Sequence, residues 1–534
     1  MKRALAAGLI QPPGLLRRAI PDWVWGVGLG LGLWQVLAVS LAGSYVLVGP
    51  WEVAQYCASH SGLLSRALAI TLWEAAWGFL WGNLAAVALA MICVLAPRAE
   101  RILAGLALAM FCLPLVATGP LLRVFYGPGL GPQITLAALA VYYTTFITFL
   151  VGLRAAPSVW FDLVRSYGHG GLAELWLIRL RAAMPYLIAG LQISAPAAIL
   201  GAMIGEFTGA ERGMGVLAIR AMRSLDIPAT WSLALLAAAV SILVYAGLGR
   251  LRGVLYPDTP ALLLNSPAPQ PSQHLAKPAW RLAEAFVITS LILLIWHWSL
   301  ETLELSRYFA KRPGDVWAYL VTDPQSATHR QILLTALGQT LVYVLPGYVL
   351  GLGLGAGLAA LVMVWPKTAL LAMPLAVTLR SVPIVTTAPL IVLALGRGAL
   401  GTITIVAVMI FFPSFVACLQ GMRQTPGQVM DVFASYAAGR RQRLIYAHLP
   451  AMLPALFASA RMAVPAAMLA GTVAEWLATG TGLGTLMAVS ASTSGYGMLW
   501  SAVVITTLTA SLAYRGVEAI EGLVLRRYAP EQLR

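Results

Sequence analysis

Two charged residues lie well inside long apolar stretches of this 534-residue chain, Arg380 and Glu74. A charge in such a stretch is costly, so it normally faces a cavity or a partner. Arg380 offers three kinds of interaction: contact with an anionic group of a bound molecule, a bond to a backbone carbonyl, or extension toward the membrane surface. Glu74 would repel an anion, and we interpret it as a helix-packing or gate residue.

A second group of residues is an acidic loop motif that occurs twice. The first copy reads Asp162-Leu-Val-Arg-Ser166-Tyr167-Gly168, followed after nine residues by Ile178-Arg-Leu180-Arg181. The second reads Asp431-Val-Phe-Ala-Ser435-Tyr436-Ala437, followed after nine residues by Ala447-His-Leu449-Pro450. Such a loop can form a short helix that docks on a soluble partner, because Gly permits a sharp turn and Pro starts a new helix. An ordinary basic connecting loop is the alternative, which two copies in equivalent places disfavour.

The two motifs belong to an internal repeat with a constant offset, the separation of Asp162 from Asp431 along the chain. We call residues related by this offset repeat mates. Many of them are identical Gly, Pro, Thr or charged residues, among them Thr71 and Thr340, Gly78 and Gly347, Pro114 and Pro383, Arg154 and Arg423, and Glu206 and Glu475. Chance similarity of apolar helices would match Leu and Ala instead. The chain therefore consists of two homologous halves.

The composition is that of a membrane protein, with 60% hydrophobic and 10% charged residues. Apolar runs of about twenty residues, enough to cross a ~30 Å hydrocarbon core, recur along most of the chain. We predict an all-α fold with about twelve spans, six in each half. They are Trp23–Leu41, Ala67–Leu95, Leu103–Leu122, Ile134–Leu153, Met184–Ile204, Trp231–Gly249, Leu282–Leu300, Leu337–Trp365, Ala369–Leu395, Leu400–Leu419, Met452–Val473 and Leu499–Ala519.

Six spans is an even number, so both halves should enter the membrane in the same direction, related by an axis along its normal. We assign residues 1–250 to the first half, the Pro-rich stretch 251–278 to a cytoplasmic linker, and residues 279–534 to the second half. Basic residues gather in alternate loops, which the positive-inside rule places in the cytoplasm together with both termini. The start of the chain lacks a cleavage pattern, so we expect no removable signal peptide.

Several kinds of chemistry find no support in the sequence. The chain contains no phosphate-binding loop; the only Lys followed by Thr is Lys367, after Trp365-Pro366. The six histidines form no metal-binding pair, and the four cysteines are far apart. The net charge of +15 is spread over loops that flank the membrane, without a nucleic-acid recognition module. We expect no catalytic, metal or nucleic-acid site.

The repeated loops, at about residues 155–182 and 424–451, resemble the EAA loop of ATP-binding-cassette (ABC) importer permeases. Asp replaces the usual Glu in both copies, Arg181 replaces the Pro in the first, and Ala437 replaces the Gly in the second. The segments after the fifth span of each half, together with Leu379-Arg380-Ser-Val-Pro383 and Ala388-Pro389-Leu390, resemble the permeases for nitrate, sulfonates, taurine and pyrimidine precursors. The resemblance covers most of both halves.

This resemblance implies a type I importer fold in a bacterial inner membrane. It implies two copies of a cytoplasmic ATPase, which would hold ATP and Mg, and a periplasmic or lipid-anchored binding protein. Its coupling residues map onto one set of positions: Asp162, Ser166, Tyr167, Gly168, Leu180, Asp431, Ser435, Tyr436, Ala437, Leu449 and Pro450. No cofactor is expected in this chain itself.

Two further sets of residues are candidates for the solute path. Arg380, its repeat mate Phe111, and the pair Thr118 and Thr387 are candidates for lining the path. The candidates for an outer gate are Glu206, Gly213, Gly215, Glu475, Gly482 and Gly484. For the two glutamates, at span ends close to water, a capping or inter-half hydrogen bond is the simpler interpretation, and the glycines could form plain turns.

Two other classes of protein share part of this pattern. A secondary transporter with two six-helix halves would have the same gross organisation, but it would need ion-coupling carboxylates or histidines, and Glu74 alone is well placed. A membrane-embedded enzyme would need a nucleophile or metal cluster within the spans. The loops favour import over export, and the solute stays open between a small anion and a flat heterocycle.

Overall fold

The computed structural model describes residues 22–40, 47–127, 129–256, 278–369, 384–396 and 398–528. Arg380 and most of the predicted linker, residues 257–277, lie outside them. In the first half the helices are α1 (Asp22–Ser40), α2 (Pro50–Ser59), α3 (Ser61–Leu95), α4 (Glu100–Phe111), α5 (Leu115–Tyr126), α6 (Gly131–Arg154), α7 (Ser158–Ser166), α8 (Gly171–Glu174), a π-helical turn (Leu175–Arg179), α9 (Leu180–Phe207), α10 (Met214–Arg223) and α11 (Ile227–Leu255).

The second half repeats this order. Its helices are α12 (Pro278–Thr302), α13 (Pro313–Trp317), α14 (Ser326–Val364), α16 (Ile384–Leu395), α17 (Ala399–Arg423), α18 (Gly427–Ser435), α19 (Arg440–Arg443), α20 (Leu449–Ala474), α21 (Gly482–Ser492) and α22 (Tyr496–Tyr528), with short 3-10 or π-helical turns at Ala318–Thr322, Pro366–Thr368, Leu444–His448 and Glu475–Thr479. The first residues of α5, α7, α8, α9 and α11 are the repeat mates of the first residues of α16, α18, α19, α20 and α22. The sequence repeat is therefore also a repeat of helix starts.

Nine helices in the described part of the chain are long and apolar enough to cross a membrane. Helices α4 and α5, which meet at 95°, make a tenth span if the bent pair is counted as one. The segment predicted as a single span, Leu103–Leu122, therefore consists of two helices with a break between them. The chain bends at Leu113-Pro114, because the proline ring disfavours helical dihedrals in the residue before it.

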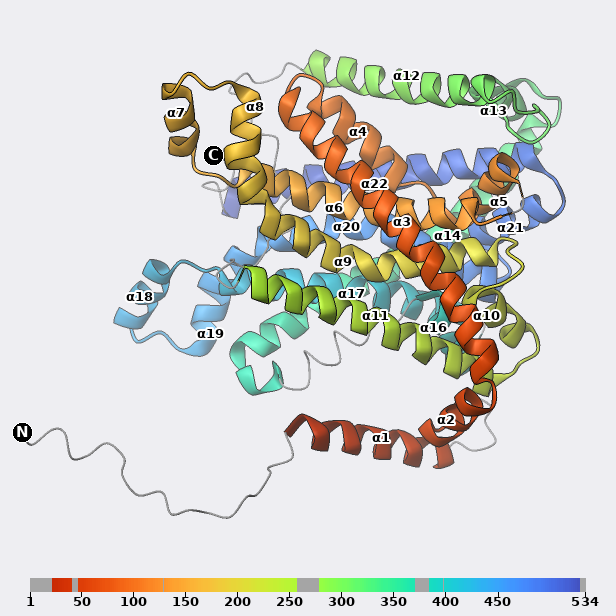
Figure 1. The fold of residues 1–534 in the computed structure, drawn as a ribbon, viewed down its shortest axis with the longest axis horizontal. Coiled ribbons are helices and arrows are strands. Elements are labelled where there is room, and N and C mark those ends of the chain that lie inside the picture. The colour runs from red at the N-terminus through yellow and green to blue at the C-terminus, as the bar shows by residue number, and fades with distance from the viewer. Residues whose placement is uncertain are drawn as a thin grey trace, which may run out of the picture.

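The long helices form a bundle in which α7 and α18 project at one end, and α10 and α21 lie at the other (Figure 1). Three long helices pack together in each half: α3, α6 and α9 in the first, and α14, α17 and α20 in the second. Helices α1 and α12 lie at opposite edges of the bundle (Figure 1).

The halves are joined by an exchange of equivalent helices. Helix α5 of the first half packs against α20, α21 and α22 of the second, and its mate α16 packs against α9 and α11 of the first. Ala117 and Leu121 of α5 lie in a buried cluster whose other fully buried members, including Leu333 and Leu483, come from the second half. Each of these helices also packs against its own half, α5 on α6 and α16 on α17, so the two helices join the cores of both halves.

Candidate functional site

The outer-gate candidates of the first half surround a buried carboxylate at the C-terminal end of α9. Glu206 is 1% exposed. Its Oε1 accepts a hydrogen bond from Thr71 Oγ1 (2.5 Å), and its Oε2 accepts one from the backbone N–H of Gly215 (2.5 Å). The Thr71 hydroxyl in turn accepts the N–H of Met214 (2.9 Å). We call Thr71, Glu206, Met214 and Gly215 the first carboxylate cluster.

The second half builds a similar arrangement from the repeat mates of these residues. Glu475 Oε1, however, accepts no hydrogen bond from a described residue, whereas Glu206 Oε1 accepts one from Thr71. Glu475, which is 0% exposed, accepts the N–H of Gly484 at Oε2 (2.8 Å). The hydroxyl of Thr340 accepts the N–H of Leu483 (2.9 Å). We call Thr340, Glu475, Leu483 and Gly484 the second carboxylate cluster. In both clusters the glutamate side chain caps the N-terminus of the next helix, where free N–H groups and the helix dipole favour an anion.

The first glycine of each Gly-x-Gly pair is required by this geometry. Gly213 has φ +127° and Gly482 has φ +84°, in the region that favours glycine. A Cβ atom at Gly213 would collide with the carboxylate of Glu206, and one at Gly482 with that of Glu475. The chain thus turns tightly around each carboxylate, and only the backbone of glycine leaves room for it.

The residues that directly follow the two glutamates meet each other. The ring centroids of Phe207 and Trp476 are 5.8 Å apart. These two residues are repeat mates, so their contact places them at the pseudo-twofold axis that relates the halves. Phe207 is buried in the core cluster that both halves share, with Trp476 packed against it. An aromatic pair therefore lies between the two halves, beside the two carboxylate clusters.

This location corrects one sequence-based interpretation. The expectation that the two glutamates lie close to water is wrong, because both are fully buried and each is bonded within its own half. A carboxylate can be buried in this way because backbone and hydroxyl donors replace its water shell. The spacing Thr71 to Glu206 is the same as Thr340 to Glu475, and that shared spacing was the available signal for the threonines.

The two acidic loops lie apart from each other at the opposite end of the bundle (Figure 1). Asp162 and Asp431 are exposed, as are Ser166, Ser435 and the tyrosines Tyr167 and Tyr436 that follow them. Large apolar side chains are exposed on the same short helices: Trp160 is 52% and Leu163 57% exposed on α7, and Val432 is 56% exposed on α18. Leu180, Leu449 and Pro450 are half-buried where α9 and α20 begin.

Equivalent bonds hold both loops against the bundle. Arg179 donates a hydrogen bond to the carbonyl of Leu153 (3.1 Å), while Nδ1 of its mate His448 lies 3.1 Å from the carbonyl of Met422, the mate of Leu153. After α7, Gly168 has φ +76°, and after α18 its mate Ala437 has φ +50°. The loop backbone is therefore the same in both halves, even where the Gly is missing.

The loops differ in charge. In the first, Arg165 Nε donates to Glu174 Oε1 (2.7 Å), and this hydrogen bond raises the pKa of Arg165 above its usual value. In the second, the mate of Glu174 is Arg443, which donates to the carbonyl of Ala438 (3.0 Å) instead. The first loop thus carries an ion pair where the second carries an arginine bonded to a backbone carbonyl.

The comparison with known families identifies this architecture. The profile of the family described as "Binding-protein-dependent transport system inner membrane component" matches residues 78–259 and again 347–529. The chain belongs to this family. It is a multi-pass permease of the inner membrane, a membrane component of an ABC transporter and not its ATPase.

Curated relatives of the permease match a length close to one of its halves. The probable ABC transporter permease protein of Haemophilus influenzae is 29% identical over 41% of this chain and 90% of its own length. The formylaminopyrimidine transport permease protein ThiX of Halalkalibacterium halodurans is 26% identical over 42% of this chain and 90% of its own. The putative aliphatic sulfonates transport permease protein SsuC of Escherichia coli is 28% identical over 44% and 87%. Relatives of this length are consistent with two fused permease halves.

The residues predicted to line the solute path lie in different parts of the permease. Phe111 stacks on Tyr143 with centroids 4.3 Å apart. Thr118 lies on α5, where its hydroxyl donates to the carbonyl of Pro114 (2.7 Å), and position 387 lies on α16. The candidate threonine positions are therefore on the two exchanged helices. Arg380 lies outside the described residues.

A buried arginine in α20 was not predicted from the sequence. Arg461 is 6% exposed and lies 3.1 Å from the carboxylate of Glu521 on α22, with Glu518 at 4.0 Å. The repeat mate of Arg461 is Gln192, whose amide donates to the carbonyl of Tyr245 (3.3 Å). Its position within the predicted span Met452–Val473 was the feature of the sequence that could have indicated a buried charge. Among the described residues, no group of three or more His, Cys, Asp or Glu is placed to hold a metal ion.

Proposed function

We propose that this single chain provides both membrane halves of a binding-protein-dependent ABC importer, with the solute path between them. The observation that carries the proposal is the pair of short helices α7 and α18, which project from the same end of the bundle and begin at the repeat mates Ser158 and Gly427. Two equivalent docking helices suit two copies of one soluble motor. The two ATPase subunits would hold ATP and Mg.

In this proposal the end with α7 and α18 faces the cytoplasm, as do both termini, and the end with α10 and α21 faces a periplasmic or lipid-anchored binding protein. The basic residues of the loops, such as Arg440 and Arg441, support this orientation through the positive-inside rule. ATP-driven closure of the two motors would move α7 and α18, and with them the spans to which they connect.

The aromatic pair Phe207 and Trp476 is the closed outer gate in this scheme. It lies at the axis, and each ring directly follows a glutamate that caps the next helix, so the carboxylate clusters hold the gate in position. Residues Gly213, Gly215, Gly482 and Gly484 act through these clusters. Alanine at both ring positions should leave a leak for small ions in the absence of ATP, measured in proteoliposomes; an unchanged basal permeability would contradict the gate.

The solute we propose is a small anion such as nitrate, bicarbonate or a sulfonate, or a pyrimidine-type heterocycle. The names of two relatives, a formylaminopyrimidine permease and an aliphatic sulfonate permease, support these classes. Arg380 is our candidate for an anion contact, together with Phe111, Thr118 and Thr387 along the path. The variant Arg380→Ala should impair uptake of an anion without lowering basal ATP hydrolysis; unimpaired uptake would contradict the contact.

The decisive experiment is reconstitution of the chain with its ATPase, with and without the binding protein, across nitrate, sulfonates, bicarbonate and pyrimidines. Stimulation of ATP hydrolysis by one loaded binding protein would establish import and name the solute. Failure of the chain to assemble with any ATPase would contradict the docking role of α7 and α18. The double variant Tyr167→Ala, Tyr436→Ala, which changes two exposed loop residues, should reduce the stimulation and leave the fold intact.

A further inference from the structure

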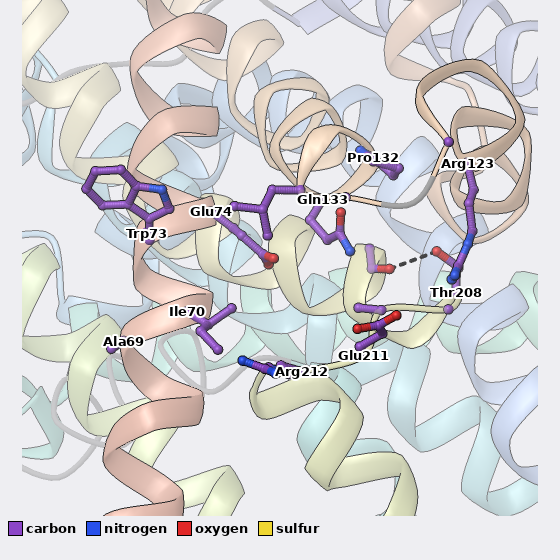
Figure 2. A pocket seen from close by; sticks show the side chains of 16 residues that line it. Ala69, Ile70, Trp73, Glu74, Arg123, Pro132, Gln133, Thr208, Glu211 and Arg212 are labelled. Carbon is purple, nitrogen blue, oxygen red and sulfur yellow. Dashed lines mark hydrogen bonds between the residues drawn. The ribbon is translucent and has the colours of Figure 1, made fainter.

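A pocket of about 690 Å³ opens on the first half, near the end that carries α10. Its walls come from α3, from the chain between α5 and α6, and from the segment that joins α9 to α10. Every residue that lines it belongs to the first half, whereas the proposed path lies between the halves. Figure 2 shows how its charged side chains surround one space.

Glu74 is the most buried of the charged residues that line this pocket. Glu74 is 0% exposed, and neither of its carboxylate oxygens accepts a hydrogen bond from a described residue. The nearby Glu206 supplies no compensating positive charge, because it is itself a carboxylate. A buried carboxylate without donors is costly, so Glu74 is suited to receive an external N–H donor or a proton.

The rim of the pocket carries charges of both signs. Arg123 reaches in from the end of α5, and Glu211 and Arg212 come from the segment after α9 (Figure 2). A guanidinium binds an oxyanion through several N–H donors. The pocket therefore presents a hydrogen-bond acceptor with negative charge at Glu74 and donors with positive charge at Arg123 and Arg212.

The second half does not repeat these groups. The repeat mates of Glu74, Arg123, Glu211 and Arg212 are Tyr343, Val392, Gly480 and Thr481. The neighbouring carboxylate cluster, by contrast, is present in both halves. The charged lining is thus an addition to the first half and is not needed for the shared fold.

We propose that this pocket binds a small zwitterion, with an ammonium group on Glu74 and an oxyanion toward Arg123 and Arg212. An ammonium group supplies the donors that both oxygens of Glu74 lack. Two sources offer this chemistry, namely a free amino-sulfonate solute and the headgroup of phosphatidylethanolamine. Trp73, which lines the pocket and is 58% exposed, is the kind of side chain that lies at a membrane interface.

The test compares ligands that differ by a single group, using the purified full chain. For the free solute, titration with 2-aminoethanesulfonate and with ethanesulfonate isolates the contribution of the amine. For the lipid, thermal unfolding is measured in phosphatidylglycerol nanodiscs with and without phosphatidylethanolamine. We expect the amine to strengthen binding by about tenfold or more, or phosphatidylethanolamine to raise the unfolding temperature, and Glu74→Gln to remove either effect.

The variant Glu74→Gln keeps the shape of the side chain, and Tyr343→Phe is the matched control at the equivalent place in the second half. If Glu74→Gln unfolds, Arg123→Gln tests the other end of the ligand, and it should weaken 2-aminoethanesulfonate and ethanesulfonate alike. An amine effect with the solute alone assigns the site to a solute, and one with the lipid alone assigns it to a headgroup. No amine dependence in either arm, or one that survives in Glu74→Gln, overturns the proposal and leaves Glu74 as a protonated packing residue.

Discussion

The two halves have the same glutamate cap in their carboxylate clusters but differ in the residues around it. Glu206 and Glu475 cap the next helix through the same N–H groups, at positions related by the repeat. Around Glu206, the first half has a charged pocket, which Ile70 helps to line. In the second half, the repeat mate of Ile70 is Gln339, whose side chain accepts the N–H of Gly482 (3.0 Å). The shared part is what the fold needs, and the differing part is where the halves can acquire separate roles.

The largest effect in this comparison is expected at the glycines. Gly482→Ala should destabilise the protein by more than about 3 kcal/mol, because the added Cβ combines a left-handed backbone with a collision against Glu475. Gly480→Ala is the control, since Gly480 also has positive φ, +71°, but no atom lies within 4 Å of its added Cβ. Thermal unfolding in detergent should show a loss of only about 1 kcal/mol there. Equal losses at both positions would refute the collision.

The next effect concerns the threonines of the two clusters. Thr71→Val and Thr340→Val each remove the hydroxyl that accepts an N–H, at nearly constant volume. Each should cost about 1–3 kcal/mol in unfolding free energy, because the N–H is left buried without a partner. The loss at Thr71 should be the larger, because its hydroxyl also donates to Glu206 Oε1; equal losses would show that this additional bond adds no stability. A loss in only one half would mean that the other cluster is held by its surroundings.

A smaller and unequal effect is expected at the docking helices. Trp160 on α7 is 52% exposed, while its mate Val429 on α18 is 38% exposed. If both dock on an ATPase, Trp160→Ala should weaken assembly about tenfold or more and Val429→Ala only severalfold, since buried tryptophans dominate interfaces. The affinity of each variant for the ATPase, titrated in detergent, measures this ratio. Equal losses would show that the motors contact the two loops alike.

The smallest effects are expected at the turns after these helices. Ala437 holds the same left-handed backbone, φ +50°, that glycine holds at position 168. Ala437→Gly should therefore stabilise the protein by about 0.5–1 kcal/mol, and Gly168→Ala should destabilise it by a similar amount. Differential scanning measurements on both variants test the opposite signs. A change of the same sign in both would show that the two turns are not equivalent.

Much of the fold follows from the spacing of residues along the chain. The offset that matched Asp162 with Asp431 also matches the starts of five helix pairs, because homologous sequences form their helices at equivalent residues. The bend at Pro114 was open to prediction and was missed. The contact between Phe207 and Trp476 could not be predicted from the sequence. A repeat shows which residues are equivalent, but not which of them lie at the axis.

The surroundings of the buried charged residues also could not be predicted from the sequence. Arg461 lies in a helix whose sequence neighbours are apolar, and its partners Glu518 and Glu521 come from another helix, so no local pattern joins them. Glu74 could be singled out as a charge in a span, but its unbonded oxygens and the surrounding arginines appear only in three dimensions.

The contact of α16 with the first half has a consequence for the order in which the protein is synthesised and folded. The surface of α9 and α11 that α16 covers is made early, yet α16 begins only at Ile384, well after α11 ends at Leu255. At ribosomal speed that interval lasts on the order of ten seconds. The first half must therefore wait in the bilayer with part of its core facing lipid. Because its missing helix is encoded further along the same message, this half always meets the correct partner and in equal number.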